Sequence, residues 1–195
     1  MNFRKHLEKA WYLLVNNLLI LIFMTLAMLV VSALTLGILA PVVAAGYLDS
    51  MIRLARDGRE PSLQDIFSQM SLFLPLLAFG FGSLIICLIG YAIFFPFGVL
   101  LACGITFGFI YVIPLMCDKR LSLAEAARQS WSMATSGQVI DHLVLVVLFL
   151  GISVIGSSIF IGTFVTTPFA AILLASVYIE KTGGRFSTAD ESRQG

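Results

Sequence analysis

Three long stretches of this sequence contain no Asp, Glu, Lys or Arg, and they restrict its fold more than any other feature. They run from Ala10 to Leu48, from Ile66 to Cys117 and from Leu143 to Ile179, and they hold 39, 52 and 37 residues. A single helix crosses the hydrocarbon core of a bilayer in about 20 residues. Each stretch is too long for one crossing and long enough for two, which predicts an all-α membrane bundle of six transmembrane helices in three hairpins.

The six predicted spans cover residues 13–35, 39–56, 71–94, 97–117, 140–158 and 161–180. The second span is the weakest, because Asp49 and Arg53 lie inside it. Apolar residues make up 59% of the chain and charged residues only 12%, whereas about a quarter of a soluble domain is charged. So few charges cannot cover the surface of a soluble globule, which excludes a soluble enzyme.

Every Lys and Arg lies outside the uncharged stretches, three in each of the four flanking segments. They are Arg4, Lys5 and Lys9; Arg53, Arg56 and Arg59; Lys119, Arg120 and Arg128; and Lys181, Arg185 and Arg193. Basic loops mark the cytoplasmic side of a membrane protein, so we expect both termini there. The net charge of +1 gives no bulk attraction to nucleic acid, and we expect no such partner. The first uncharged stretch is longer than a signal-peptide core, so we expect it to be retained.

The three hairpins follow one plan, which predicts an internal repeat. Residues 1–180 form a single membrane domain with units at about 1–57, 58–118 and 119–180, and each unit is an amphipathic helix followed by a hairpin. Pro41, Pro96 and Pro168 each stand near the start of a returning span, where proline lacks no needed hydrogen bond. The polar tail at 181–195 is expected to be a disordered cytoplasmic segment.

Helix-capping residues support the amphipathic helix that is predicted before each hairpin, which we call the entry helix. Ser62-x-x-Asp65 and Ser122-x-x-Glu125 match the capping box, in which a hydroxyl and a carboxylate satisfy free backbone N–H groups. Asn2 is expected to cap the N-terminal helix in the same way.

Two tryptophans lie on the apolar faces of the predicted entry helices. Trp11 and Trp131 are expected to sit at the headgroup level of the cytoplasmic interface, where tryptophan is favoured. The alternative is that these faces form a groove for a partner protein.

The segment Gly58–Phe67, the spacing Pro41-x-x-x-x-Gly46 and the segment Glu125–Trp131 together resemble a known layout. This layout is that of the six-helix bacterial inner-membrane proteins grouped as domains of unknown function. It is also similar in plan to the membrane domain of some glycerophosphodiester phosphodiesterases. The resemblance implies six helices and a bacterial inner (plasma) membrane, and it implies no activity.

Few residues of this chain suggest chemistry. Asp49 and Arg53 are spaced to form an ion pair on one helix face, and the alternative is that they form a gate. The Asp141 carboxylate lies at the start of the fifth predicted span, where it interacts favourably with the helix dipole. An intramembrane hydrolase would need His142 within hydrogen-bond reach of a Ser, Asp or Cys. The chain contains no H-E-x-x-H, Walker A or C-x-x-C motif. We therefore expect no catalytic residues, no metal site and no cofactor.

Small residues recur at a spacing of four on the fourth predicted span. Gly98-x-x-x-Ala102 and Gly104-x-x-x-Gly108 allow close approach of helix backbones. We expect packing within one chain, with a homo-oligomer interface as the alternative.

The sequence favours a non-enzymatic scaffold or accessory protein that acts through its cytoplasmic face or its contacts with membrane lipids. A protein partner would then bind the cytoplasmic face. The alternative is a small transporter or channel for an apolar or lipid-like solute. A transporter requires a cavity lined by Ser, Thr and Gly from at least two hairpins, whereas a scaffold requires a packed centre.

Overall fold

The computed structural model describes residues 3–135, 139–158 and 160–184, and this part of the chain is helical with no strand. The predicted all-α class is therefore confirmed. In chain order the elements are α1 (Phe3–Asn16), α2 (Leu18–Leu34), α3 (Ala40–Asp57), η1 (Leu63–Phe67), η2 (Met70–Leu72), α4 (Phe73–Ile93), α5 (Phe95–Phe109), α6 (Val112–Lys119), α7 (Leu123–Thr135), α8 (Val139–Ser158) and α9 (Phe160–Lys181).

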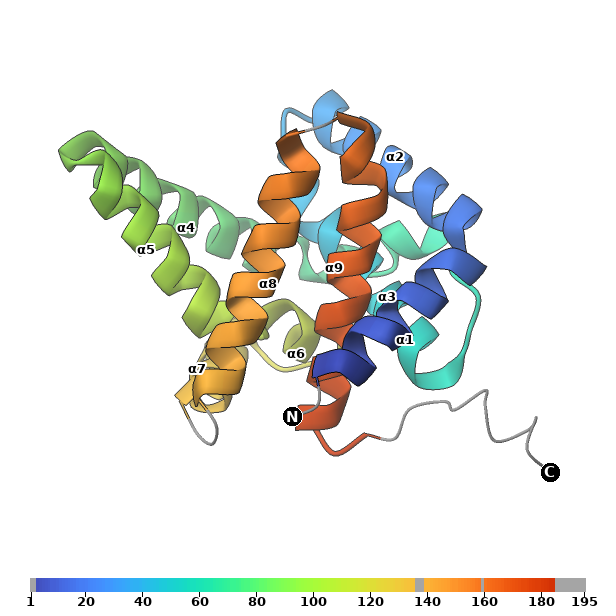
Figure 1. The fold of residues 1–195 in the computed structure, drawn as a ribbon. Helices are drawn as coiled ribbons and strands as arrows, with labels where there is room; N and C mark the ends of the chain where they lie inside the picture. Colours follow the sequence, from blue (N-terminus) through green and yellow to red (C-terminus); the bar gives the residue numbers. More distant parts are fainter. Residues whose placement is uncertain (1–2, 136–138, 159, 185–195) are drawn as a thin grey trace.

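Helix α9 is the centre of the bundle. It pairs with α8 and also packs against α1, α2 and α3, whereas the α4–α5 hairpin diverges from the other helices (Figure 1). The start of α1 lies beside the end of α9 (Figure 1). Long runs of α3 and α9 are buried. Large side chains of the core include Leu14, Leu21, Met51, Tyr111, Leu115, Ile172 and Tyr178.

Four helical segments of the described chain are long and apolar enough to cross a bilayer. They are Leu63–Ile93, Phe95–Lys119, Val139–Gly156 and Gly162–Lys181. Helices α1 and α2 would together supply a fifth, but they meet at 88°. Length and composition thus support four or five crossings, and the six-span arrangement stays a prediction.

The first predicted span, residues 13–35, is wrong as a single helix because the chain breaks at Asn17. The Asn17 side chain donates from Nδ2 to the Leu13 carbonyl at 3.0 Å, and its backbone lies outside the helical region at φ −119°. Asparagine competes in this way with the helical hydrogen bonds of its own backbone. Helix α1 therefore turns away from α2 and packs its face of His6, Ala10 and Leu14 into the protein.

The amphipathic helix predicted after Ser62 is replaced by the two short 3₁₀ helices η1 and η2. A Cβ atom on Gly46 of α3 would overlap the Ile66 carbonyl oxygen and lie 2.6 Å from the Asp65 oxygen. The backbone of η1 therefore rests directly on α3. This tertiary contact overrides the helical periodicity of the segment, and the second repeat unit differs from the first.

Prolines account for two further differences. The predicted span at 97–117 is divided between α5 and α6, because Pro114 has no N–H to donate to the Ile110 carbonyl. Pro41 and Pro96 lie in the first turns of α3 and α5, as predicted. Pro168 lies inside α9, which already begins at Phe160, so its predicted place near a helix start is wrong.

Candidate functional site

An apolar cavity of about 400 Å³ lies among helices from all three predicted hairpins. Its walls come from α2 and α3, from α4, α5 and α6, and from α8 and α9. None of the described residues that line it is an Asp, Glu, Lys, Arg or His. Its volume falls within the range of about 300–1,000 Å³ that is usual for small-molecule sites. The arrangement can hold an uncharged molecule or chain.

The polar groups of the cavity are hydroxyls, and most belong to α8 and α9. The lining hydroxyl residues are Tyr47, Thr106, Ser153, Thr163, Thr166 and Thr167. Four of them donate to backbone carbonyls: Thr106 to Ala102 at 2.9 Å, Ser153 to Phe149 at 2.7 Å, Thr163 to Gly156 at 3.0 Å and Thr166 to Gly162 at 2.9 Å. These residues were not among the predicted site residues. The run of Ser and Thr between residues 153 and 167 is the signal that marks them.

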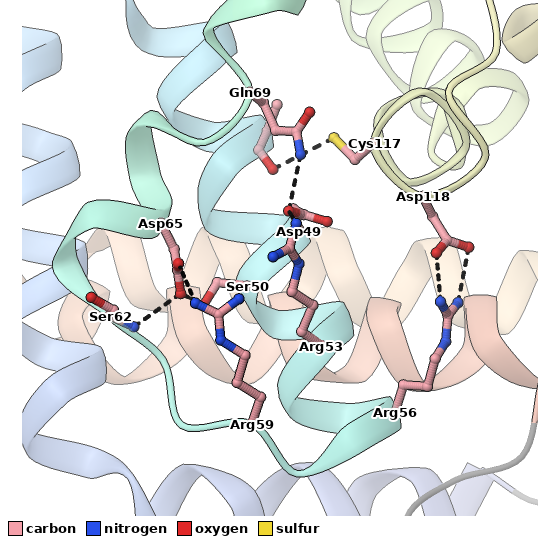
Figure 2. A network of polar contacts seen from close by, with 11 residues as sticks. Asp49, Ser50, Arg53, Arg56, Arg59, Ser62, Asp65, Gln69, Cys117 and Asp118 are labelled. Carbon is pink, nitrogen blue, oxygen red and sulfur yellow. Dashed lines mark hydrogen bonds and ion pairs between the residues drawn. The ribbon is translucent and has the colours of Figure 1, made fainter.

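A second polar region lies around the C-terminal half of α3 and contains three ion pairs (Figure 2). They are Arg53 Nη2 with Asp49 Oδ2 at 2.6 Å, Arg56 with Asp118 at 2.5 and 2.9 Å, and Arg59 Nη2 with Asp65 Oδ1 at 3.0 Å. The predicted Asp49–Arg53 pair is therefore confirmed. We call these six residues the ion-pair network.

Each carboxylate of the ion-pair network also accepts a hydrogen bond from an uncharged donor. Gln69 Nε2 donates to Asp49 at 2.9 Å, Ser50 Oγ donates to Asp65 at 2.9 Å, and Tyr178 Oη donates to Asp118 at 3.0 Å; Figure 2 draws the first two of these donors. Buried carboxylates of this kind are stable only when their oxygens are paired. The network therefore serves to hold α3, η1, α6 and α9 together.

His6 of α1 lies between a serine and a carboxylate of α9. Its Nδ1 is 2.7 Å from Ser176 Oγ, and its Nε2 is 2.5 Å from Glu180 Oε2. Such an order suits nucleophilic catalysis, but a nucleophile must reach its substrate. Ser176 has no exposed surface, and His6 is only 4% exposed. The cluster therefore links α1 to α9. The sequence offered no signal for it, because 170 residues separate His6 from Ser176.

His142 lies in a different environment from the one that a hydrolase requires. Its Nε2 hydrogen-bonds the Phe107 carbonyl at 2.7 Å, and its ring contacts the rings of Phe107 and Tyr111. No Ser, Asp or Cys side chain in the described chain hydrogen-bonds to it. Because Nε2 faces a carbonyl, it carries the proton in the neutral ring.

Both predicted capping boxes are confirmed. Ser62 accepts from Gln64 N at 3.4 Å while Asp65 accepts from Ser62 N at 3.0 Å. Glu125 N donates to Ser122 Oγ at 3.4 Å, and Ser122 N donates to Glu125 Oε2 at 3.1 Å. The hydrogen bonds from Ser122 hold the pKa of the Glu125 carboxyl below its ordinary value. Asn2, the third predicted cap, lies outside the described residues.

The two tryptophans are about half exposed, at 58% for Trp11 and 53% for Trp131. Trp11 meets the Phe169 ring edge to face at 6.3 Å, and Trp131 packs near Phe109. Each indole thus keeps one side on the protein and one side outward, a placement that suits an interface anchor.

The predicted helix-packing residues of α5 divide into two kinds. A Cβ atom on Gly108 would lie 2.7 Å from the Trp131 ring, and one on Gly98 would collide with the Tyr91 ring, so both glycines pack within the chain. Gly104 has no atom within 4 Å of such a Cβ and is exposed, and Ala102 is half-buried. Gly104 therefore does not take part in the predicted contact.

Within the described chain, no three His, Cys, Asp or Glu side chains gather in a group that could hold a metal ion. Cys117 is buried, whereas Cys103 is exposed. No family model, curated protein or solved structure matches this chain.

Proposed function

We propose that this chain is a non-enzymatic, multi-pass protein of the bacterial inner membrane that binds an apolar or lipid-like solute as a small transporter. The observation that carries the proposal is the uncharged cavity of about 400 Å³. Residues from all three predicted hairpins line it, which is what a transporter requires and a packed scaffold does not. His142 has no Ser, Asp or Cys hydrogen-bond partner among the described residues, and Ser176 has no exposed surface for a substrate to reach. Both observations support a non-enzymatic role.

The α4–α5 hairpin supports access to the cavity from the bilayer. Phe79, Ile105 and Thr106 of this hairpin form part of the cavity wall. Many of its other side chains are apolar and exposed, including Phe81, Leu84, Ile85, Leu88, Ile89, Phe94, Phe95 and Leu100. Water does not stabilise so large an apolar surface, but lipid chains do. A solute dissolved in the bilayer would therefore reach the cavity along this hairpin.

A second candidate function is the scaffold or accessory role. The ion-pair network and the capped start of α7 favour it, because they fix a polar surface of defined shape at one end of the helices. In this role the surface contacts a partner protein, and membrane lipids contact the apolar helices.

Native mass spectrometry of the protein released from gentle detergent tests both functions. We expect a monomer that retains one lipid-like molecule at fixed stoichiometry. The variant Ala171→Phe, which fills the cavity wall, should lose that molecule. Ala33→Phe is the matched control, because Ala33 is exposed on α2 and outside the cavity.

Thermal unfolding of both variants checks that they are folded, and Ala171→Leu offers a smaller filling change. Equal retention of the molecule by wild type and a folded Ala171 variant would contradict the transporter proposal. A defined oligomer or a co-purified protein, without a bound small molecule, would favour the scaffold instead.

A further inference from the structure

We infer that the cavity selects a neutral lipid that ends in a free hydroxyl group, such as a long-chain alcohol or a diacylglycerol. This inference rests on the proposed function and names the class of its ligand. It follows from the charges, donors and acceptors of the cavity wall.

The described wall of the cavity carries no charged side chain. No Lys, Arg or His among the described residues lines the cavity, so no side chain there can balance a carboxylate or a phosphate. A charged group moved into apolar surroundings without a partner is strongly disfavoured. The polar end of a ligand held inside must therefore be neutral.

Four hydroxyl groups of the cavity wall already use their protons in hydrogen bonds within the protein. Thr106, Ser153, Thr163 and Thr166 each donate their proton to a backbone carbonyl. A hydroxyl that donates once keeps its oxygen lone pairs as acceptors. These four residues can accept a hydrogen bond from a ligand but have no proton left to give.

The Tyr47 hydroxyl is in the same state. Thr25 Oγ1 donates to the Leu21 carbonyl at 2.8 Å, so the Thr25 proton is already used. In the 3.1 Å contact between Thr25 Oγ1 and Tyr47 Oη, Tyr47 is therefore the donor. Its oxygen too can only accept from a ligand.

Thr167 is the exception. Its hydroxyl makes no hydrogen bond with the described part of the chain, and the residue is half-buried in the cavity wall. Among the described residues it is the one lining hydroxyl that retains a proton. The described part of the wall thus offers several acceptors and a single donor. A ligand hydroxyl group complements this wall, because it can donate to one of the acceptors and accept from Thr167.

An ester has no hydrogen-bond donor, so it leaves the acceptors of the cavity wall without a partner. Hydrogen-bonding groups that are left unpaired lower the affinity for such a ligand. Four molecules with one 18-carbon chain isolate this effect: oleyl alcohol, methyl oleate, ionised oleic acid and octadecene. We expect oleyl alcohol to bind the purified full-length protein about five- to tenfold more tightly than the other three. Displacement of a fluorescent fatty alcohol gives the affinities.

Variants of Thr167 test whether this residue causes the preference for an alcohol over an ester. Thr167→Val should remove the advantage of oleyl alcohol over methyl oleate, and Thr167→Ser should restore it. Thr182→Val is the control, because it makes the same change of a threonine hydroxyl to a methyl group at a residue outside the cavity. Comparing dioleoylglycerol with oleyl alcohol distinguishes the two sources of the hydroxyl group.

Equal binding of all four molecules, or tighter binding of the ester or the acid, would overturn the inference and leave the proposed function standing. An unchanged alcohol-to-ester ratio in Thr167→Val would also overturn it. If none of the four molecules binds, the proposed function fails as well.

Discussion

At the residue scale, a bidentate ion pair joins two residues that are far apart in the sequence. Arg56 of α3 and Asp118 of α6 form two hydrogen bonds although they lie 62 positions apart in the sequence, and Tyr178 of α9 donates to the same carboxylate. A paired, bidentate guanidinium and carboxylate is more specific in geometry than a single contact. Three helices therefore depend on one carboxyl group.

Asp118→Asn should lower the free energy of unfolding by about 1–2 kcal/mol, because it leaves Arg56 without a counter-charge. The cost is below the roughly 3–5 kcal/mol of a fully buried pair, since the Arg56 side chain is 32% exposed. Glu8→Gln is the matched control, because its partner Arg4 is 87% exposed, and it should change stability by less than about 0.5 kcal/mol. Thermal unfolding in detergent measures both. Equal effects of the two substitutions would contradict the structural role of Asp118.

Glu125 gives a prediction about pH. The hydrogen bonds from Ser122 lower its pKa in the folded protein below the ordinary 4.5, so between these two values the unfolded chain binds more protons. The stabilisation is therefore present above pH 4.5 and is lost as the pH falls through the folded pKa. Glu125→Gln keeps the cap without titrating. The difference in melting temperature between wild type and Glu125→Gln should shrink on acidification, and a difference independent of pH would contradict the cap.

Local contacts could be predicted from the sequence, whereas distant ones could not. The pairs Ser62–Asp65 and Asp49–Arg53 have partners three or four residues apart, so helix geometry alone brings them together. Asp118 stands next to Lys119 in the chain, and nothing local points it toward Arg56. The hydroxyls of the cavity were missed for the same reason, because packing of separate hairpins brings them together.

At the element scale, the contact between α3 and η1 decides how the second unit enters the bundle. Gly46 lies under the carbonyl oxygens of Asp65 and Ile66, with no room for a side chain. Apolar periodicity predicted one amphipathic helix at this point, and the structure has two short 3₁₀ helices instead. Periodicity reports which residues face inward, but it does not report how closely another backbone approaches.

Gly46→Ala should therefore destabilise the protein by about 1–3 kcal/mol, because the backbone of η1 would have to move. Gly104→Ala is the matched control on α5, where a methyl group meets no atom within 4 Å. Alanine is the better helix former, so this control should be neutral or stabilising by up to about 1 kcal/mol. Melting temperatures measure both effects. A neutral Gly46→Ala would mean that η1 does not press on α3.

At the scale of the whole molecule, the number of membrane crossings depends on α2 and α3. The two helices are joined by a tight turn with positive φ angles at Leu36 and Gly37, and Leu36 is 91% exposed. Helix α3 is too polar to qualify as a span by composition, although most of its residues are buried. The uncharged stretch predicted two crossings here. A six-span protein would require α3 to cross the membrane, and burial of α3 within the bundle would allow it to carry Asp49 and Arg53 there.

A single cysteine at Leu36 tests this topology. In a chain whose native cysteines are replaced by alanine, Leu36→Cys should react with a membrane-impermeant maleimide added outside intact cells, because the turn faces outward in a six-span protein. Ala124→Cys, on the exposed face of α7, should react only after lysis. Labelling of Leu36→Cys only after lysis would mean that α2 and α3 enter and leave the membrane on the same side.

The link from His6 to Ser176 and Glu180 also sets an order of events during synthesis. Helix α1 is synthesised before α9, and its partners on α9 are made about 170 residues later. Until then α1 lacks its main partner, because its other contacts, with α2 and the Ala55 carbonyl of α3, are fewer. Its amphipathic character suits a position on the membrane surface during this time. Helix α1 is thus fixed in place only after α9 has been made, and its docking reports that α9 has joined the bundle.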